Sequence, residues 1–238
     1  MMQLDFKHHI VLTLSIFLLF LNCDTRFEGN TRIAVEGLVV DTAGNAIEGA
    51  EISVYATRST GSFLAPGPSG SNQFLLGRNY SDANGNFAVV SLFDNGLDIV
   101  INAGDDYSRY VYANYGSDYR PPNNSFNLEN VTLNNLALVN YSITRTSGEG
   151  NSISFTLNYT DPDCSLVYID GVLNEAESNC NSTNILTQTL NDNVSETNGS
   201  LSTIVGSTLE FVYSLNGAPE ITETVSVDAA NFQFNFTY

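Results

Sequence analysis

Apolar and polar side chains alternate with a period of two along most of the chain beyond Arg26. Successive side chains of a strand point to opposite faces of its sheet, so this pattern predicts strands that each bury one face. Clusters of Gly, Asn and Asp interrupt the alternation at short intervals, as tight turns require. No segment beyond Arg26 has the period of a helix. The sequence therefore predicts an all-β protein built from β-sandwiches.

The alternating segments fall into two sets. The first set contains residues 33–40, 51–57, 74–80, 86–91, 97–103 and 109–114. The second set contains residues 138–144, 152–159, 165–169, 185–190, 208–215, 221–227 and 231–238. Residues 117–133, stiffened by two adjacent prolines, are expected to form a linker and an entry strand. The expected domains are β-sandwiches at residues 33–116 and 134–238.

The N-terminal segment is typical of a secretory signal. A basic start precedes an almost entirely apolar run at residues 10–21, which is shorter than the roughly 20 residues that a membrane span needs. The run ends in "LNC", which resembles a bacterial lipobox, in which the cysteine is lipidated and becomes the new N-terminus. We expect residues 1–22 to be removed, Cys23 to carry the lipid and residues 23–32 to form a tether. The alternative is an ordinary signal with a chance cysteine.

Removal of residues 1–22 changes the chemistry that the chain can perform. The only lysine and both histidines lie in that segment. The 25 acidic residues and 7 arginines that remain after it still give a net charge of −18. This excess of negative charge argues against nucleic acid or an anionic lipid surface as partner, because both require clustered cations.

The missing histidine limits the reactions open to the protein. Ser-His-Asp and Cys-His sites need an imidazole base, and catalytic zinc sites depend on histidine ligands. Carboxylate-only glycoside hydrolysis remains, which needs two acids facing each other across a cleft. Pairs such as Asp161/Asp163 and Asp105/Asp106 are explained more simply as solvated loop charges. The sequence therefore predicts a protein that is not an enzyme and needs no cofactor.

The two cysteines that follow Cys23 are expected to form a structural disulfide. Cys164 and Cys180 are an even pair in a chain that leaves the cytoplasm. A bridge between them closes a loop of about 15 residues, which contributes roughly 3 kcal/mol in the chain-entropy account. A metal site made from two cysteines without histidine is the weaker alternative.

Two stretches of the first half resemble the carboxypeptidase regulatory-like domain, a transthyretin-type β-sandwich. They are "VEGLVVDTAGNAIEGAEISVYA" and "LLGRNYSDANGNFAVVSLFDNGLDIVINAGDDY", within residues 33 to about 115. The matched positions are Val35, Gly37, Val39, Asp41, Gly44, Ile47, Gly49, Ala50, Ile52, Val54, Ser81, Asp82, Gly85, Phe87 and Tyr107. The resemblance implies a non-catalytic module. For the second half, seven strands and a cysteine pair leave an immunoglobulin-like or a second transthyretin-like sandwich open.

The stretch "SDANGN" looks at first like half of a calcium loop. An EF-hand loop places glycine at position 6 and a bidentate Glu at position 12. Counted from Asp82, glycine falls at position 4 and Phe93 at position 12. We therefore expect a hairpin turn with Gly85 at its tip and the Asp82 side chain capping the amides, and no metal site.

Two segments are candidates for ligand binding. The first carries tyrosines that can stack on sugars, with an arginine among them: Tyr107, Arg109, Tyr110, Tyr112, Tyr115 and Tyr119. The alternative is that these rings are half-buried at a sandwich edge or a domain interface. The second is the Gly/Pro-rich insertion at residues 58–73, where Phe63 and Leu64 mark either a binding loop or a plain connection.

The last segment, "NFQFNFTY", places its aromatic residues on one face of a strand. It either closes its own sandwich, inserts into a barrel, or is donated to a neighbouring subunit. Taken together, the sequence favours a non-catalytic, lipid-anchored lipoprotein of the cell envelope, on either face of the outer membrane. It would act as a binding or scaffolding module for a glycan or an envelope protein. The alternatives are a fimbrial assembly subunit that uses this strand and, less favoured, a carboxylate-only glycosidase.

Overall fold

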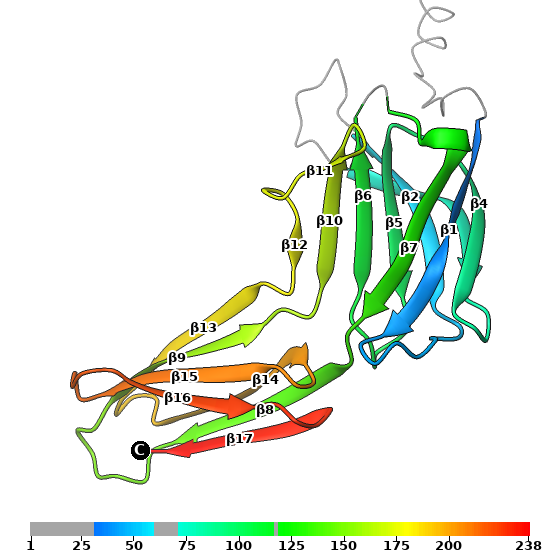
Figure 1. The fold of residues 1–238 in the computed structure, drawn as a ribbon. Helices are drawn as coiled ribbons and strands as arrows, with labels where there is room; N and C mark the ends of the chain where they lie inside the picture. The colour runs from blue at the N-terminus through cyan, green and yellow to red at the C-terminus, as the bar shows by residue number, and fades with distance from the viewer. Residues whose placement is uncertain (1–30, 60–70, 117–118) are drawn as a thin grey trace, which may run out of the picture.

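The computed structural model describes residues 31–59, 71–116 and 119–238. These residues form strands and one short 3-10 turn, η2 (Pro122–Asn124), which confirms the all-β prediction (Figure 1). Within the described ranges, no helix is long and apolar enough to cross a membrane. The predicted signal segment, Cys23, Phe63 and Leu64 lie outside the described residues.

The first sandwich contains two sheets with a shared core. Its three-stranded sheet has the order β4-β1-β7 and comprises β1 (Arg32–Asp41), β4 (Asn86–Leu92) and β7 (Ser125–Leu133). The facing sheet has the order β3-β2-β5-β6 and comprises β2 (Glu51–Ser59), β3 (Ser71–Tyr80), β5 (Gly96–Asn102) and β6 (Tyr110–Tyr115). Alternate residues of each strand enter the core, as Leu97, Ile99 and Ile101 of β5 do.

The second sandwich repeats this strand order. One sheet, β14-β8-β17, comprises β8 (Leu136–Thr144), β14 (Glu196–Ile204) and β17 (Asn231–Thr237). The other, β13-β9-β15-β16, comprises β9 (Ile153–Thr160), β13 (Thr183–Leu190), β15 (Thr208–Leu215) and β16 (Ile221–Ser226). In both sandwiches the first strand lies between the fourth and the last, antiparallel to the one and parallel to the other. The topology supports the alternative in which both halves share one type of sandwich.

A short excursion of the chain crosses from the second sandwich to the first. Between β9 and β13 lie β10 (Cys164–Ile169), β11 (Val172–Leu173) and β12 (Asn179–Cys180). β10 pairs in parallel with β6 along its whole length and extends the larger sheet of the first sandwich. The assignment of residues 165–169 to the second sandwich was therefore wrong. The second sandwich still has seven strands, because it contains β14, which the alternation did not reveal.

The first sandwich also extends further than its predicted boundary. The segment expected to be a linker contains β7, which pairs in parallel with β1. Phe126, Val131 and Leu133 of β7 are buried in the first core. This burial explains why the segment packs into the first sandwich instead of forming a linker between the two sandwiches. Only residues 134–135 connect β7 of the first sandwich to β8 of the second.

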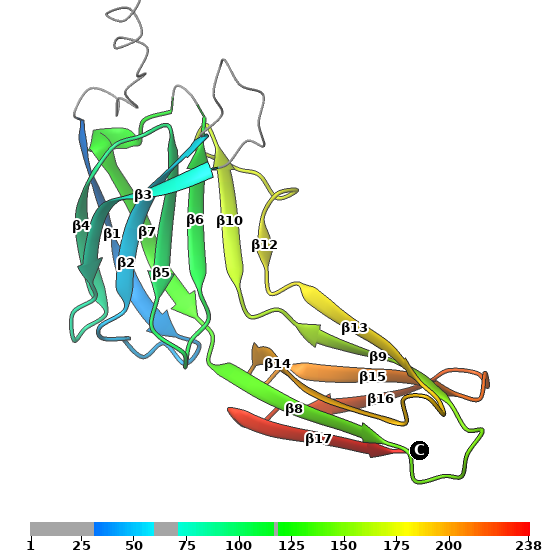
Figure 2. The ribbon, with the colours of Figure 1, turned by 180° about the vertical axis from the view of Figure 1, so that it is seen from behind.

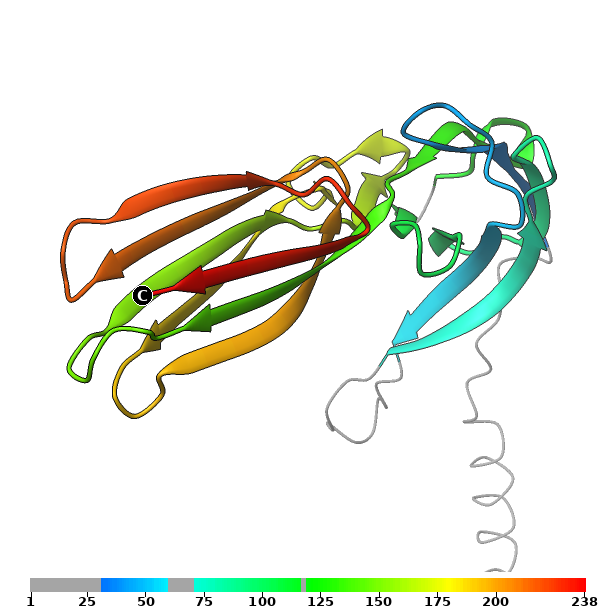
Figure 3. The same ribbon diagram turned by 90° about the horizontal axis from the view of Figure 1, so that it is seen from below.

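The molecule is elongated and bent where the sandwiches meet (Figure 1). β1 begins at the end of the first sandwich remote from the second, whereas the C-terminus lies at the far end of the second. Seen from behind, β10 and β12 lie at one edge of the larger sheet (Figure 2), and β3 is the last strand at the other end of the strand order. From below, the second sandwich projects sideways from the first (Figure 3).

The stretch that resembles a calcium loop is a tight turn, but it is not the tip of a hairpin as predicted, because it connects β3 and β4, which belong to different sheets. The carboxylate of Asp82 accepts hydrogen bonds from the amides of Asn84 (2.8 Å) and Asn86 (2.9 Å), and Gly85 has φ +79°. Asp41 makes the same contacts with the amides of Ala43 and Asn45. Phe87, which follows the turn, is buried in the first core.

These two turns give a matched pair of substitutions. Gly85→Ala and Gly44→Ala each place a Cβ on a residue with positive φ, which costs about 1–2 kcal/mol. At Gly85 the new Cβ would also lie 2.4 Å from the carbonyl oxygen of Val39, whereas at Gly44 nothing lies within 4 Å. Urea unfolding of both variants should show the larger loss of stability for Gly85→Ala. Equal losses would contradict the packing of this turn against β1.

Candidate functional site: the tyrosines of the first sandwich

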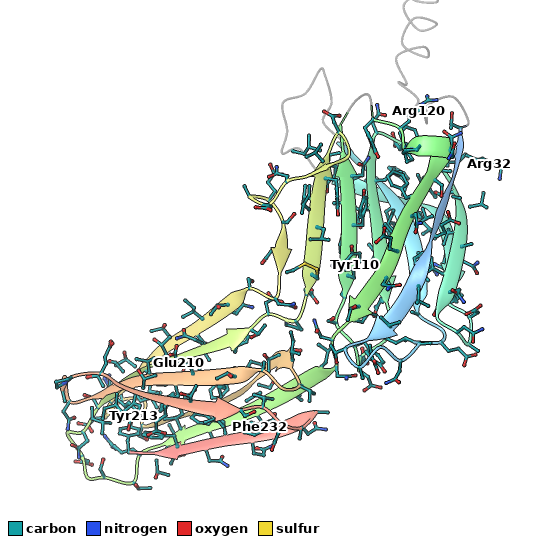
Figure 4. All side chains as sticks on the ribbon, viewed as in Figure 1. Arg32, Tyr110, Arg120, Glu210, Tyr213 and Phe232 are labelled. Carbon is teal, nitrogen blue, oxygen red and sulfur yellow. A yellow bond between two sulfur atoms is a disulfide. The ribbon has the colours of Figure 1, made fainter. Side chains whose placement is uncertain are left out.

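Four of the five candidate tyrosines pack against the core of the first sandwich. Tyr107, Tyr110, Tyr112 and Tyr119 are half-buried against the core. Figure 4 shows Tyr110 on β6, which lies in the sheet that faces β7. This position agrees with the alternative of half-buried rings, because strand alternation turns Tyr110 and Tyr112 inward. Only Tyr115 and Arg109 line the outer face of the sheet.

Tyr112 is the centre of an aromatic cluster that draws on three strands. Its ring stacks on Tyr168 of β10, with centroids 4.3 Å apart, and meets Phe126 of β7 edge-on at 5.8 Å. Tyr168 reaches this position because β10 pairs with β6. Sequence reasoning missed both partners. The only signal was the apolar run that begins at Cys164.

Burial sets the ionisation of these tyrosines. Desolvation raises the pKa of Tyr110 to about 12, and the neighbouring Tyr168 adds to the rise. The pKa of Tyr112 is raised further, again mainly by burial and then by Tyr168, Tyr119 and Tyr110. Both hydroxyls are therefore neutral at physiological pH and can donate hydrogen bonds.

A pocket of ≈ 420 Å³ opens beside this cluster, and we refer to it as the tyrosine pocket. It lies between β6, β1, β7 and the segment that includes η2. Its lining comprises Glu36, Tyr112, Tyr119, Pro121, Pro122, Asn123, Ser125, Phe126, Asn127 and Leu128. The structure thus brings together two of the predicted tyrosines with residues that sequence reasoning had assigned to a linker.

The rim of the tyrosine pocket is polar. Ser125 donates a hydrogen bond from Oγ to Oε1 of Glu36 at 3.0 Å, and Oδ1 of Asn127 accepts one from the Glu129 amide at 2.9 Å. Asn123 has φ 55°, in the left-handed region. Aromatic rings with a carboxylate and amides at the rim suit a ligand with one apolar face and several hydroxyl groups.

The fifth tyrosine belongs to a separate network on the outer face of the sheet. The Tyr115 hydroxyl donates to Oδ1 of Asp98 at 3.0 Å, and Thr57 donates to Oδ2 at 3.0 Å. Asp98 is only 8% exposed, so these donors stabilise its charge. Burial, followed by the Asp98 charge, raises the pKa of Tyr115 to about 12. Arg109 lines a smaller pocket of ≈ 240 Å³ on the same face.

The predicted disulfide is confirmed. Cys164 and Cys180 are bonded and lie opposite each other on β10 and β12. In the described part of the chain, no group of three or more His, Cys, Asp or Glu side chains is placed to hold a metal ion. Asp161, one of the acids weighed for catalysis, accepts hydrogen bonds from the Asp163 amide and the Asn184 side chain, and so shapes the turn after β9.

The tyrosine pocket lies in the first of the protein's two β-sandwiches. No protein-family model matches the chain, and no curated protein matches it. The TIE protein of Bacillus anthracis aligns with 12% identity over 87% of this chain and 34% of that protein, at a TM-score of 0.29. A streptococcal ancillary pilin aligns with 12% identity over 88% of this chain and 63% of that one, at 0.28.

The tip fimbrial protein Mfa3 of Porphyromonas gingivalis, with a C-terminal truncation, aligns with 10% identity over 82% of each chain, at 0.29. This chain spans less than two thirds of the TIE protein and of the ancillary pilin. At TM-scores this low, the likeness carries no argument about function. The resemblance of residues 33–115 to the carboxypeptidase regulatory-like domain stays a prediction.

The Asp98 network predicts a defined alkaline transition. The fold holds Tyr115 protonated up to about pH 12, against an ordinary pKa of 10.0. Its contribution to stability is therefore complete below pH 10.0 and is lost as the pH rises through about 12. Tyr115→Phe should cost about 1–2 kcal/mol at neutral pH and weaken the loss of stability above pH 10.0.

Denaturant unfolding at several pH values, with tyrosinate absorbance as a second readout, measures this transition. The control is Tyr80→Phe, which removes a hydroxyl that donates to Glu51 from an exposed position. That variant should keep the wild-type pH profile. A Tyr115→Phe profile that matches the wild type would show that the hydrogen bond to Asp98 does not stabilise the fold.

Proposed function

We propose that this protein is a non-catalytic structural module of the cell envelope, in which two sandwiches form one rigid, bent scaffold. The observation that carries the proposal is the excursion at residues 164–180, which leaves the second sandwich and becomes part of the first. Domains joined by a single linker move relative to each other by default. Here the second domain supplies strands to the sheet of the first, which opposes such motion.

The chain crosses between the sandwiches three times, and each crossing is short. The connections are residues 134–135, residues 161–163 and residues 181–182. One hydrogen bond joins the first connection to the third, because the Asn134 side chain donates to Oδ1 of Asn181 at 3.1 Å. The backbones of Ser108 and Asn134 are also bonded, at 2.8 Å. These short, bonded crossings support a fixed angle at the junction.

A scaffold of this kind holds its two ends at a set distance. With lipid at Cys23, the start of β1 would lie nearest the outer membrane and the end of the second sandwich furthest from it. The partner at the distal end would be a glycan or another envelope protein. This arrangement also accounts for the absence of histidine and lysine after the signal segment, since spacing requires neither a base nor a nucleophile.

The rigidity can be measured in the soluble chain of residues 24–238. Residual dipolar couplings from both sandwiches should fit a single alignment tensor. In a variant with residues 165–179 replaced by a Gly/Ser linker, the two sandwiches should require separate tensors. The matched control replaces the exposed β15–β16 turn at residues 216–219 with the same type of linker and should keep one tensor. Two tensors for the wild type would refute the scaffold.

The disulfide should stabilise the docked excursion, because it restricts the conformations of the unfolded chain. Cys164→Ser/Cys180→Ser is expected to lower the free energy of unfolding by about 3 kcal/mol, from the loop that the bridge closes. Reduction of the wild type with dithiothreitol should give the same loss, whereas dithiothreitol should not change the variant. Thermal unfolding with and without reductant checks both. An unchanged stability in the double variant would show that β12 docks without the bridge.

The fimbrial alternative requires the last strand, β17, to be donated to a neighbouring subunit. β17 pairs with β8 of its own sandwich, and Phe234 and Tyr238 are buried in that core. Deletion of residues 231–238 is therefore expected to unfold the second sandwich, visible as loss of its dispersed amide signals in NMR spectra. A folded monomer that regains stability with an added peptide of this sequence would instead support strand donation.

A further inference from the structure

The tyrosine pocket has the features of a site for a small ligand. Its volume of ≈ 420 Å³ falls within the range of about 300–1,000 Å³ typical of such sites. Its walls come from segments that are far apart in sequence, at Glu36, Tyr112 and residues 119–128. We propose that this pocket binds a neutral saccharide through one pyranose ring. The scaffold role is independent of this proposal.

The apolar wall of the pocket suits the C–H face of a pyranose ring. Tyr112, Tyr119 and Phe126 supply aromatic surface, and Leu128 and two prolines complete it. A pyranose has one face of C–H groups and an edge of hydroxyl groups, so it matches aromatic surface on one side and polar groups on the other. A purely apolar ligand would leave the polar rim without partners.

The rim supplies hydrogen-bonding groups of both kinds. The carboxylate of Glu36 keeps acceptor capacity beyond the bond from Ser125, and it can receive two neighbouring sugar hydroxyls. The Glu129 amide fixes the Asn127 side chain through its oxygen, which orients the two N–H donors of that side chain. Asn123 adds a further amide. This combination satisfies hydroxyl groups, which both donate and accept.

The charge of the pocket favours the binding of neutral sugars over negatively charged ones. Among the lining residues that the structure describes, Glu36 is the only ionisable carboxylate or base. Its negative charge, in a protein with a net charge of −18, disfavours uronic acids and phosphorylated sugars.

The pocket is held in shape before any ligand arrives. Tyr112 is fixed by its stack on Tyr168 and its edge contact with Phe126. The two prolines restrict the backbone of the neighbouring segment. Preorganisation of this kind lowers the entropy lost on binding. It is a feature expected of a site more than of an accidental surface hollow.

Backbone conformation gives an independent sign. Six non-glycine residues in the described part of the chain have positive φ, and three of them line or adjoin the pocket: Asn123, Asn124 and Glu129. Glu129 lies opposite the register shift between Glu36 and Leu38, where β7 bulges. Left-handed residues and bulges are enriched at binding sites, where they re-aim side chains.

The test titrates the soluble chain of residues 24–238 with methyl glycosides of glucose, galactose, mannose and N-acetylglucosamine, and with glucuronic acid. Chemical shift changes at the tyrosine pocket measure binding. At least one neutral glycoside should bind, and glucuronic acid should bind more weakly. Glu36→Gln and Asn127→Ala should each weaken binding about tenfold, because the first replaces a charged acceptor with a weaker neutral one and the second removes the amide group. Both residues are exposed on strands, so the fold should persist.

Tyr80→Ala is the control, since it removes an exposed tyrosine from β3, remote from the pocket lining. It should bind as the wild type does. The proposal is overturned if no glycoside shifts the pocket signals, or if the Glu36 and Asn127 variants bind as tightly as the control. Preferential binding of a lysine-rich peptide would assign the pocket to a cationic partner and also overturn it. None of these outcomes alters the dipolar couplings that test the scaffold.

Discussion

The parallel pairing of β6 with β10 is the interaction on which the rest of the structure depends. It joins the excursion from the second sandwich to the larger sheet of the first through six residue pairs, Cys164 to Ile169 against Tyr110 to Tyr115. It covers the edge of β6, which would otherwise be open to pairing with another chain. The edge strands that replace it, β11 and β12, have two residues each, and β12 is tied to β10 by the disulfide. The same pairing carries Tyr168 onto Tyr112 and so shapes the pocket.

The strands themselves were largely predictable from the sequence, but their partners were not. Alternation depends on one buried face, which is a local property, and it located thirteen of the strands, including β17 with its aromatic face. β14 escaped because most of its residues are polar Thr, Asn and Ser, with Leu201 as its main buried apolar side chain. β7 was taken for part of a linker and an entry strand, because two prolines precede it, and its pairing with β1 of the first sandwich was not foreseen. The transfer of β10 to the first sandwich depends on contacts far apart in sequence, which periodicity does not report.

The candidate site was predictable in the same partial way. Side chains two residues apart share one face of a strand, so Tyr110 and Tyr112 lie on one face of β6 and Tyr115 on the other. Which face is buried depends on the opposing sheet, and here β7 supplies Phe126 to the face that carries Tyr112. The polar rim of the pocket was invisible from the sequence. Glu36 reaches it from β1 only because β7 runs parallel to that strand and brings Ser125 within hydrogen-bonding distance.

The pocket and the junction are linked through one residue pair. Tyr112 presents its ring to the pocket while it stacks on Tyr168, and Tyr168 belongs to the excursion that joins the sandwiches. Tyr119 makes a second link, because its ring lies so close to the β10–β11 turn that a Cβ on Gly171 would come within 2.3 Å of it. A saccharide held against Tyr112 and Tyr119 would restrict both rings in the positions that a docked β10 requires. Because such coupling is reciprocal, a ligand in the pocket and a docked β10 would stabilise each other, while the docking itself rests on the pairing of β10 with β6 and does not require the ligand.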